Sequence, residues 1–255
     1  LSADYRYKSL DEWKKVYSKE AAIYKRNDDD LCKEAVYGLP EINKDAILKG
    51  KLIACPGCYP TSALIPLAPY LSQGIIENDG IVIDSKSGTS GGGREPNQKF
   101  LLSECGEGLS AYGLITHRHT SEIEQIASSV SGNKIELLFT PHLIPISRGM
   151  HSTIYGRLRD PGLTSDDCRI LLDNFYRNFK NIKVLPVDTY PSTKWVKNTN
   201  QIYLSVKVDN RNGRIIILSV IDNLLKGQTG QAIQNLNIMS GFSMDDGLEL
   251  TNNFP

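Results

Sequence analysis

Two cysteines three positions apart, Cys55 and Cys58, frame a Pro-Gly turn between a short apolar stretch at 52–54 and a long apolar segment at 60–71. This spacing is compatible with half of a zinc site, a reversible dithiol, a single nucleophile or two buried structural cysteines. Zinc requires further ligands, and the sequence offers neither a second C-x-x-C pair nor a pair of histidines nearby in the chain.

The turn leads from a predicted strand into a predicted helix, so Cys58 would lie on the first helical turn. The dipole and free amides of a helix N-terminus favour a thiolate, and they can also stabilise the oxyanion of an attacked carbonyl. Cys55 ends the buried strand instead. Of the two cysteines, we therefore predict Cys58 as the nucleophile.

A second group consists of His117 and His119, two of only four histidines, which flank Arg118 just ahead of a predicted helix. In an extended chain both rings face the same side and could bind a metal, but no third ligand is evident, and we predict no metal site. One imidazole could instead serve a nucleophilic cysteine as acid/base, oriented by Glu122. A cluster of surface histidines is the alternative.

Two glycine-containing segments could approach a ligand closely. Residues 87–93 (SGTSGGG) are expected to form a mobile loop whose free amides, beside Arg94, suit a phosphate or a nicotinamide. A flexible linker is the alternative. Residues 226–232 (KGQTGQA) lead into a predicted helix, and their two glycines permit close backbone contact.

The composition excludes several classes of partner. The 29 Lys+Arg residues balance 29 Asp+Glu residues, so no basic field would attract nucleic acid or an anionic membrane. Apolar stretches such as 215–218 are far too short to span a bilayer. Five cysteines form a sparse, odd set, which favours a reducing compartment: the cytoplasm or, in a eukaryote, an organelle.

These residues must be positioned by a mixture of helices and strands, and 255 residues suffice for two domains. Alternating apolar residues and the Asn212-Gly213 turn predict an antiparallel hairpin of 202–208 with 214–221. Pro66 and Pro69 are expected to kink or shorten the apolar helix. Further helices are predicted at 9–21, at 43–49, from Ser121, from Thr164 and at 230–239, and strands at 81–83, 135–139 and 151–157.

Taken together, these motifs resemble those of the N-acetyl-gamma-glutamyl-phosphate reductases, acyl-phosphate reductases of arginine biosynthesis related to aspartate-semialdehyde dehydrogenases. The resemblance extends from the first residue almost to the last. It rests on the segments 1–6 (LSADYR), 37–41 (YGLPE), 55–61 (CPGCYPT), 87–91 (SGTSG), Tyr112 with 117–119 (HRH), 139–142 (FTPH), Arg148-Gly149 and 226–235.

The resemblance implies an α/β and α+β fold. A partial Rossmann-like NADP-binding domain would join a catalytic domain like that of glyceraldehyde-3-phosphate and aspartate-semialdehyde dehydrogenases, with a mostly antiparallel sheet. Residues 1–80 would be the later part of the first domain, 81–221 the catalytic and dimerisation domain, and 222–255 a closing helix that returns to the first. No glycine-rich dinucleotide turn follows a strand. We therefore expect the family's N-terminal nucleotide-binding half to be missing, and this chain alone to bind NADPH weakly and be inactive.

The family's reaction is the reduction by NADPH of N-acetyl-L-glutamyl 5-phosphate to N-acetyl-L-glutamate 5-semialdehyde, with release of phosphate. The resemblance implies a thioester on Cys58, with His117 as acid/base oriented by Glu122. His119 is the rival acid/base, or a substrate contact.

The remaining residues would bind the ligands. Arg6 and Arg148 are expected to anchor the anionic groups of the acyl phosphate. Ser87, Gly88, Gly91 and Asn235 are expected to line the nicotinamide side. A homo-oligomer, dimer or tetramer, is expected, with neither nucleic acid nor membrane as a partner.

Three rival functions are distinguishable. An aspartate-semialdehyde dehydrogenase has the same reaction type, but the Cys-Tyr-Pro-Thr and His-Arg-His stretches argue against it. A non-catalytic binding fragment would lack the cofactor half, and a dithiol redox protein would form a reversible bond between Cys55 and Cys58.

Overall fold

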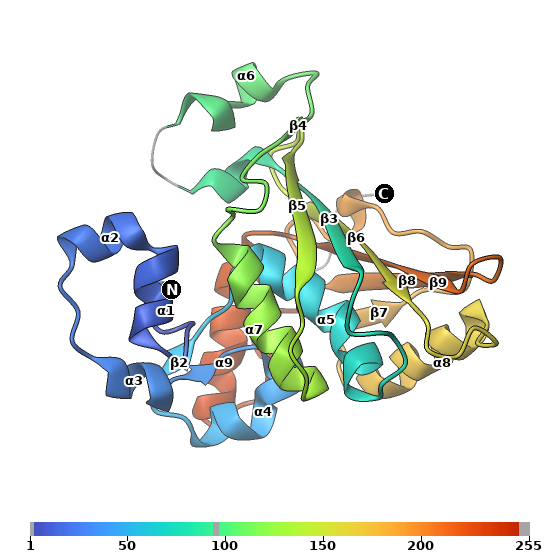
Figure 1. Cartoon of the computed structure of the whole chain (residues 1–255), viewed down its shortest axis with the longest axis horizontal. Coiled ribbons are helices and arrows are strands. Elements are labelled where there is room, and N and C mark those ends of the chain that lie inside the picture. The colour runs from blue at the N-terminus through green and yellow to red at the C-terminus, as the bar shows by residue number, and fades with distance from the viewer. Residues whose placement is uncertain (1–2, 94–96, 250–255) are drawn as a thin grey trace.

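The computed structural model describes residues 3–93 and 97–249, so Arg94 and the first two residues of the 1–6 motif lie outside the described residues. Its largest element is a seven-stranded mixed sheet of order β4-β5-β3-β6-β9-β8-β7 (Figure 1). The pairs β3–β5 and β7–β8 are parallel and the other four are antiparallel. The predicted fold class is therefore confirmed. The strands are β3 (Ile81–Ser87), β4 (Ser110–Ala111), β5 (Leu137–Leu143), β6 (Met150–Arg157), β7 (Ile182–Val184), β8 (Ile202–Asp209) and β9 (Arg214–Ile221).

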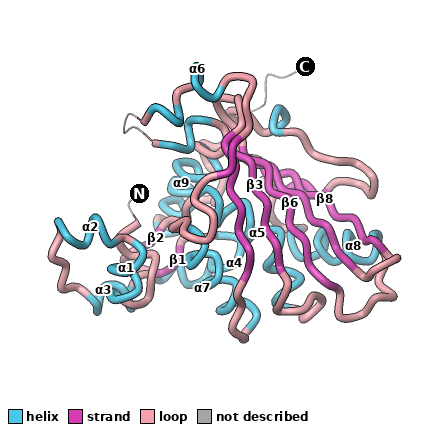
Figure 2. The backbone as a smooth tube through the Cα atoms, turned by 45° about the horizontal axis from the view of Figure 1, so that its top comes forward, coloured by secondary structure: helices cyan, strands magenta, loops and turns pink. Residues whose placement is uncertain are grey.

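Side-chain alternation explains how this sheet meets its helices. In β3 every second residue from Ile81 is buried, as expected when one face packs on a core. The predicted hairpin is confirmed, because β8 pairs with β9 from Ile202 opposite Ile221 to Asp209 opposite Arg214. Helices α5 (Cys58–Ser72), α7 (His119–Ser131) and α8 (Ser165–Tyr176) pack on one face of the sheet (Figure 2).

The central helix α5 continues without interruption past Pro66 and Pro69, the positions at which shortening was expected. Pro69 has no N–H to donate to the carbonyl of Ile65. The hydroxyl of Tyr176, on α8, donates to that carbonyl instead. Residues 59–71 of the helix are all buried. Tertiary packing therefore stabilises a helix that lacks the backbone hydrogen bonds its two prolines cannot donate. The expectation that the prolines shorten this helix is therefore wrong.

A smaller β-α-β unit precedes α5. Strands β1 (Val36–Tyr37) and β2 (Ile53–Ala54) pair in parallel, and α4 (Pro40–Lys49) connects them. The last helix, α9 (Gly230–Met239), packs on α4, and the amide of Asn235 donates to the carbonyl of Gly38 over 2.9 Å. The chain after residue 222 therefore returns to its first part. The domain limits at 80 and 221 stay predictions.

The N-terminal helices α1 (Leu10–Val16), α2 (Ser18–Ile23) and α3 (Asp29–Glu34) form a separate small lobe (Figure 1). The predicted helix at 9–21 is thus two helices, interrupted at Tyr17. The lobe has its own core of Tyr7, Leu10, Trp13, Tyr17 and Cys32. The hydroxyl of Tyr7 donates to the carbonyl of Arg118, over 2.9 Å, and so attaches the lobe to the start of α7.

The segment between β3 and α7 projects from one end of the sheet (Figure 1). It contains the short helical turns η1 (Thr89–Gly92) and η2 (Gln98–Phe100), helix α6 (Leu102–Cys105) and strand β4. Within residues 3–93 and 97–249, no helix is long and apolar enough to cross a membrane.

Candidate active site

Cys58 is the first residue of α5, as the sequence predicts, with the extended residue Gly57 as the N-cap. Burial raises the pKa of the Cys58 thiol to about 11. The backbone amides of Tyr59 and Cys58 act in the opposite direction, because N–H groups at a helix start favour the thiolate. The helix therefore supplies the electrostatic support that a nucleophilic sulfur requires, and desolvation opposes it.

Two glycines allow other backbone and side chains to lie against this turn. A Cβ on Gly227 would lie 2.8 Å from the Cβ of Cys58, so the segment after β9 could not pass there with a larger residue. A Cβ on Gly57 would lie 2.3 Å from Nε2 of His119. Gly227 thus lies close to the protein's own nucleophile candidate, a neighbour that sequence analysis did not identify, and the approach of the 226–232 glycines to a ligand stays a prediction.

The two predicted histidines lie side by side, with ring centroids 4.9 Å apart. His119 is the first residue of α7, two residues earlier than the predicted helix start, and its backbone N–H donates to Nδ1 of His117 over 3.1 Å. Burial lowers the pKa of His117 to about 4 and that of His119 well below its usual value. Both imidazoles are therefore neutral at neutral pH. The acceptor nitrogen of His117, Nδ1, is already used by the His119 N–H, whereas Nδ1 of His119 has no partner among the described residues.

The surroundings of the two rings differ. His119 packs on Gly57, the neighbour of Cys58. His117 packs edge-on against Tyr59 and Tyr112, with centroids 5.5 and 5.6 Å away. Among the described residues, neither imidazole forms a hydrogen bond with Cys58, so the choice between them stays a prediction.

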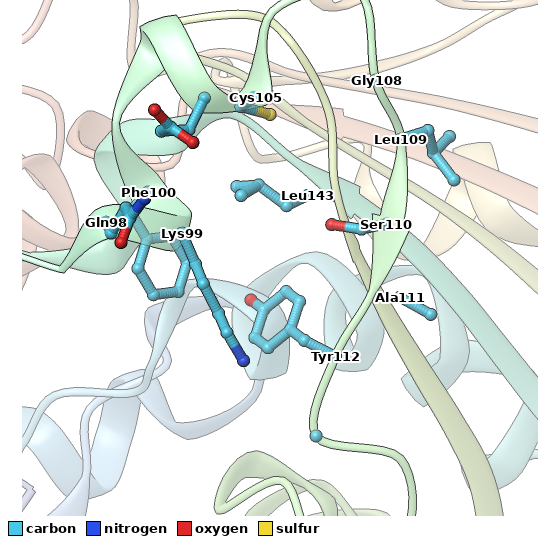
Figure 3. A pocket seen from close by; sticks show the side chains of 12 residues that line it. Gln98, Lys99, Phe100, Cys105, Gly108, Leu109, Ser110, Ala111, Tyr112 and Leu143 are labelled. Carbon is cyan, nitrogen blue, oxygen red and sulfur yellow. The ribbon is translucent and has the colours of Figure 1, made fainter.

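Tyr112 also borders a cavity of about 760 Å³ beneath the projecting segment (Figure 3). Its hydroxyl lies 2.9 Å from that of Tyr59. Lys99 extends along the cavity wall between Phe100 and Tyr112 (Figure 3). The lining holds one cation, Lys99, and one carboxylate, Glu104, and the cavity is connected to the histidines only through the ring contact of Tyr112 with His117.

Sequence analysis expected Glu122 to orient His117, but the structure of the described residues shows other partners for this carboxylate. It is completely buried in the first turn of α7, where Oε1 accepts the N–H of Gly57 over 3.0 Å and the hydroxyl of Tyr37 over 2.9 Å. Oε2 pairs with the guanidinium of Arg6 over 3.2 Å. Both oxygens of Glu122 are thus engaged by the cysteine turn, Tyr37 and Arg6 instead of by His117. Sequence analysis also missed Tyr37 as a partner of this carboxylate.

Arg6 and Arg148, the predicted anion anchors, are both engaged. Arg6 is 8% exposed, and besides Glu122 it donates from Nε to the carbonyl of Cys55 over 2.7 Å. Arg148 donates from Nη2 to the buried carboxylate of Asp222 over 2.9 Å. Its Nε is buried and has no partner among the described residues. Arg148 thus keeps a donor available, whereas Arg6 is largely committed to the protein.

The glycine segment 87–93 is not the loop of free amides that the sequence suggested. Ser87 ends β3, and the amides of Gly88, Thr89, Ser90 and Gly91 donate to carbonyls of the protein itself. A Cβ on Gly88 would lie 2.7 Å from the carbonyl oxygen of Ile146. These residues are held against the β5–β6 connection, so the interpretation as an amide-lined anion site is wrong.

Asn235 reaches the rear of the cysteine turn. Its Nδ2 contacts the sulfur of Cys55 at 3.5 Å as well as the carbonyl of Gly38, while its buried Oδ1 has no partner among the described residues. Nearby, Lys226 forms a fully buried ion pair with Glu41 over 2.6 Å. Sequence analysis noted Lys226 only as part of the glycine-containing segment and did not predict this pair. In the part of the chain that the structure describes, no group of three or more His, Cys, Asp or Glu residues could hold a metal.

Comparison with known proteins gives concordant results. A family model described as the dimerisation domain of semialdehyde dehydrogenases matches residues 58–223. A protein of Prochlorococcus marinus strain MIT 9301, named N-acetyl-gamma-glutamyl-phosphate reductase, is 94% identical over all 255 residues, which span 73% of that relative. A relative of the same name from strain MIT 9211 is 62% identical over 255 residues, 71% of its length.

Solved structures agree at the level of the fold. Aspartate semialdehyde dehydrogenase II from Vibrio cholerae, complexed with ASA, superimposes with a TM-score of 0.66 at 16% identity. The match covers 82% of this chain and 68% of that one. At this identity the likeness concerns the arrangement of strands and helices, and it agrees with the sheet described above.

Proposed function

The chain belongs to the N-acetyl-gamma-glutamyl-phosphate reductases, and from this membership we propose how its residues divide the work of the reaction. The enzyme is an oxidoreductase of arginine biosynthesis that reduces N-acetyl-L-glutamyl 5-phosphate to the 5-semialdehyde. The observation that carries the assignment of roles is the placement of Cys58 at the N-terminus of α5, beside two buried neutral imidazoles.

Cys58 is the nucleophile in this proposal. Its sulfur attacks the acyl carbon, the carbon–oxygen bond to phosphate breaks, and phosphate leaves with the electron pair, which makes a thioester. The thiol proton passes to a neutral imidazole, with His117 as our choice and His119 as the rival. Amides at the start of α5 stabilise the oxyanion that forms on the attacked carbonyl. Because burial raises the pKa of Cys58, proton removal by a neighbouring base is required.

We propose NADPH as the cofactor, and when bound it supplies the hydride that reduces the acyl group. The buried Oδ1 of Asn235, which has no partner within residues 3–93 and 97–249, fits the N–H donor of a carboxamide. For Ser87, Gly88 and Gly91 the family resemblance alone supports contact with the nicotinamide side, because their backbone groups serve the protein's own structure.

Arg148 is the better supported anchor for the acyl phosphate, because its buried Nε has no partner in the part of the chain that the structure describes. His119 stays a candidate substrate contact. The dimerisation-domain match supports assembly of identical chains, and we propose a dimer or tetramer. The bacterial relatives support a cytoplasmic location.

The experiment compares Cys58→Ser with Cys55→Ser in the protein that carries this chain, by following NADPH oxidation with N-acetyl-L-glutamyl 5-phosphate. Cys58→Ser should abolish nearly all turnover and Cys55→Ser should keep most of it, because only Cys58 lies at the helix start. The reverse ranking would overturn the assignment. L-Aspartyl phosphate is the control substrate, and its equal or faster reduction would favour the aspartate-semialdehyde dehydrogenase alternative.

A further inference from the structure

Two side chains hold the three residues that lead into Cys58. Arg6 donates from Nε to the carbonyl of Cys55 over 2.7 Å, and Glu122 accepts the N–H of Gly57 over 3.0 Å. The two are joined by a buried ion pair of 3.2 Å, with side-chain exposures of 7% and 0%. One pair of opposite charges thus bonds to both ends of the segment 55–57.

We propose that the Arg6–Glu122 ion pair is a clamp that fixes the Cys55–Gly57 backbone and thereby sets the position of the Cys58 sulfur at the start of α5. Both are positioning residues, since neither is required to touch the substrate. The proposal rests on the role given above to Cys58, and it replaces the predicted roles of Arg6 as a substrate anchor and Glu122 as a support for His117.

The geometry requires a carboxylate at position 122. Three donors converge on it: the N–H of Gly57, the hydroxyl of Tyr37 and the guanidinium of Arg6. A carboxylate has two acceptor oxygens for these donors, whereas a glutamine amide has one and turns its own donors toward the rest. Glu122→Gln therefore loosens the clamp although it hardly changes the size of the side chain.

The geometry also requires a guanidinium at position 6. Nε and Nη1 of Arg6 point to two different acceptors, the Cys55 carbonyl and the Glu122 carboxylate. A lysine ammonium is a single point of charge without this fork. Arg6→Lys therefore keeps the charge and loses at least part of the bridge.

The clamp has two effects on Cys58 that can be measured separately. Burial raises the pKa of Cys58 most, the charge of Arg6 lowers it, and the charge of Glu122 raises it. Tyr59 and Tyr112, which also face the sulfur, have raised pKa values, and His117 and His119 have lowered ones. None of these four groups changes its charge near neutral pH, so a shift can be assigned to the pair.

The test measures kcat, KM and the pH profile of Cys58 alkylation by iodoacetamide, followed on the Cys58 peptide by mass spectrometry. Arg6→Met should move the alkylation profile to higher pH and Glu122→Gln should move it to lower pH. Both should lower kcat by roughly 10- to 100-fold with little change in KM, because a displacement near 1 Å suffices for such a loss. Arg6→Lys should lower kcat with little shift of the profile.

Arg26→Met is the matched control. Arg26 belongs to the same N-terminal lobe, has a side-chain exposure of 11% and pairs with Asp28 over 3.0 Å, without contact to segment 55–57. It should leave kcat and the alkylation profile unchanged. Circular dichroism and thermal melting establish folding of each variant, and if Arg6→Met does not fold, Arg6→Lys and Glu122→Gln decide.

Three results would overturn the clamp. A kcat that rises in Glu122→Gln and falls in Arg6→Met would mean that charge alone acts on the thiol. A large rise in KM at constant kcat in Arg6→Met would restore Arg6 as a substrate anchor. Changes no larger than those of Arg26→Met would leave the pair without a role. Failure of the proposed function is distinct, because it would show as absent turnover in the unmodified protein, whereas alkylation needs no turnover.

Discussion

Replacing Gly57 by alanine should displace His119 from its place beside the nucleophile. The added Cβ would lie 2.3 Å from Nε2 and 2.7 Å from Cε1 of the imidazole. Gly57 has φ −72° and ψ 163°, which alanine adopts without strain, so the clash falls on the ring rather than on the backbone torsions. Ordinary contact between such atoms needs about 3.5 Å, and the ring or the turn must therefore move by more than ~1 Å.

The size of the effect follows from that displacement. Overpacking in a closed site costs about 1–3 kcal/mol. For a chain of this length that corresponds to a loss of roughly 2–12 °C in melting temperature. If His119 or its neighbour His117 moves the thiol proton, a shift near 1 Å should lower kcat on the order of 100-fold.

The assay combines thermal unfolding with steady-state turnover of Gly57→Ala, His119→Ala and the double variant. In the double variant the clash is absent, so Gly57→Ala should cost much less stability in the His119→Ala background than in the unmodified protein. Any loss of N-cap quality from the alanine occurs in both backgrounds and cancels in the difference between these two costs. A Gly57→Ala protein with unchanged melting temperature and kcat, or a double variant whose losses simply add, would refute the reasoning.

Three further predictions concern the histidines and the prolines. His117→Asn should lower kcat by roughly 10²–10⁴-fold with a much smaller change in KM, as measured by NADPH oxidation, and the same pattern in His119→Asn alone would exchange their roles. Because burial lowers the pKa of His117 to about 4, the unfolded chain binds more protons than the folded one between pH 6.5 and 4. Stability in urea should therefore fall as the pH drops through this range, by up to about 3 kcal/mol from this group, and a pH dependence undiminished in His117→Asn would contradict this origin. Tyr176→Phe should destabilise the protein by about 1–3 kcal/mol in thermal unfolding, since the Ile65 carbonyl loses its donor. Adding Pro69→Ala should recover part of the loss by restoring an amide four residues after Ile65, and no recovery would argue against this account of the helix.

Local sequence signals established much of the architecture. Alternation in 202–208 and 214–221, with Asn212-Gly213 between them, is sufficient for the β8–β9 hairpin, because strand period and turn chemistry are properties of neighbouring residues. The same holds for the start of α8, where Thr164 and Asp167 form the predicted capping box. The placement of Cys58 at a helix start also follows from the few residues around it.

Interactions between distant segments were decided only by the tertiary structure. Ile65 and Tyr176 are 111 residues apart, and their hydrogen bond is what lets α5 continue past Pro69. Whether the amides of 87–91 are free depends on the carbonyls of the β5–β6 connection, which no pattern within those five residues can reveal.

The same reason explains why the sequence yielded Glu122 and Arg6 as residues of interest but not their partners. Composition and spacing identify a side chain's chemistry, while its partners depend on the register of α7 and on the docking of a lobe 116 residues earlier in the chain. In the folded chain Glu122 bonds to the backbone before Cys58 and not to the predicted imidazole. The sequence by itself determined which residues could do the chemistry, and packing between distant elements determined which of them hold the others in place.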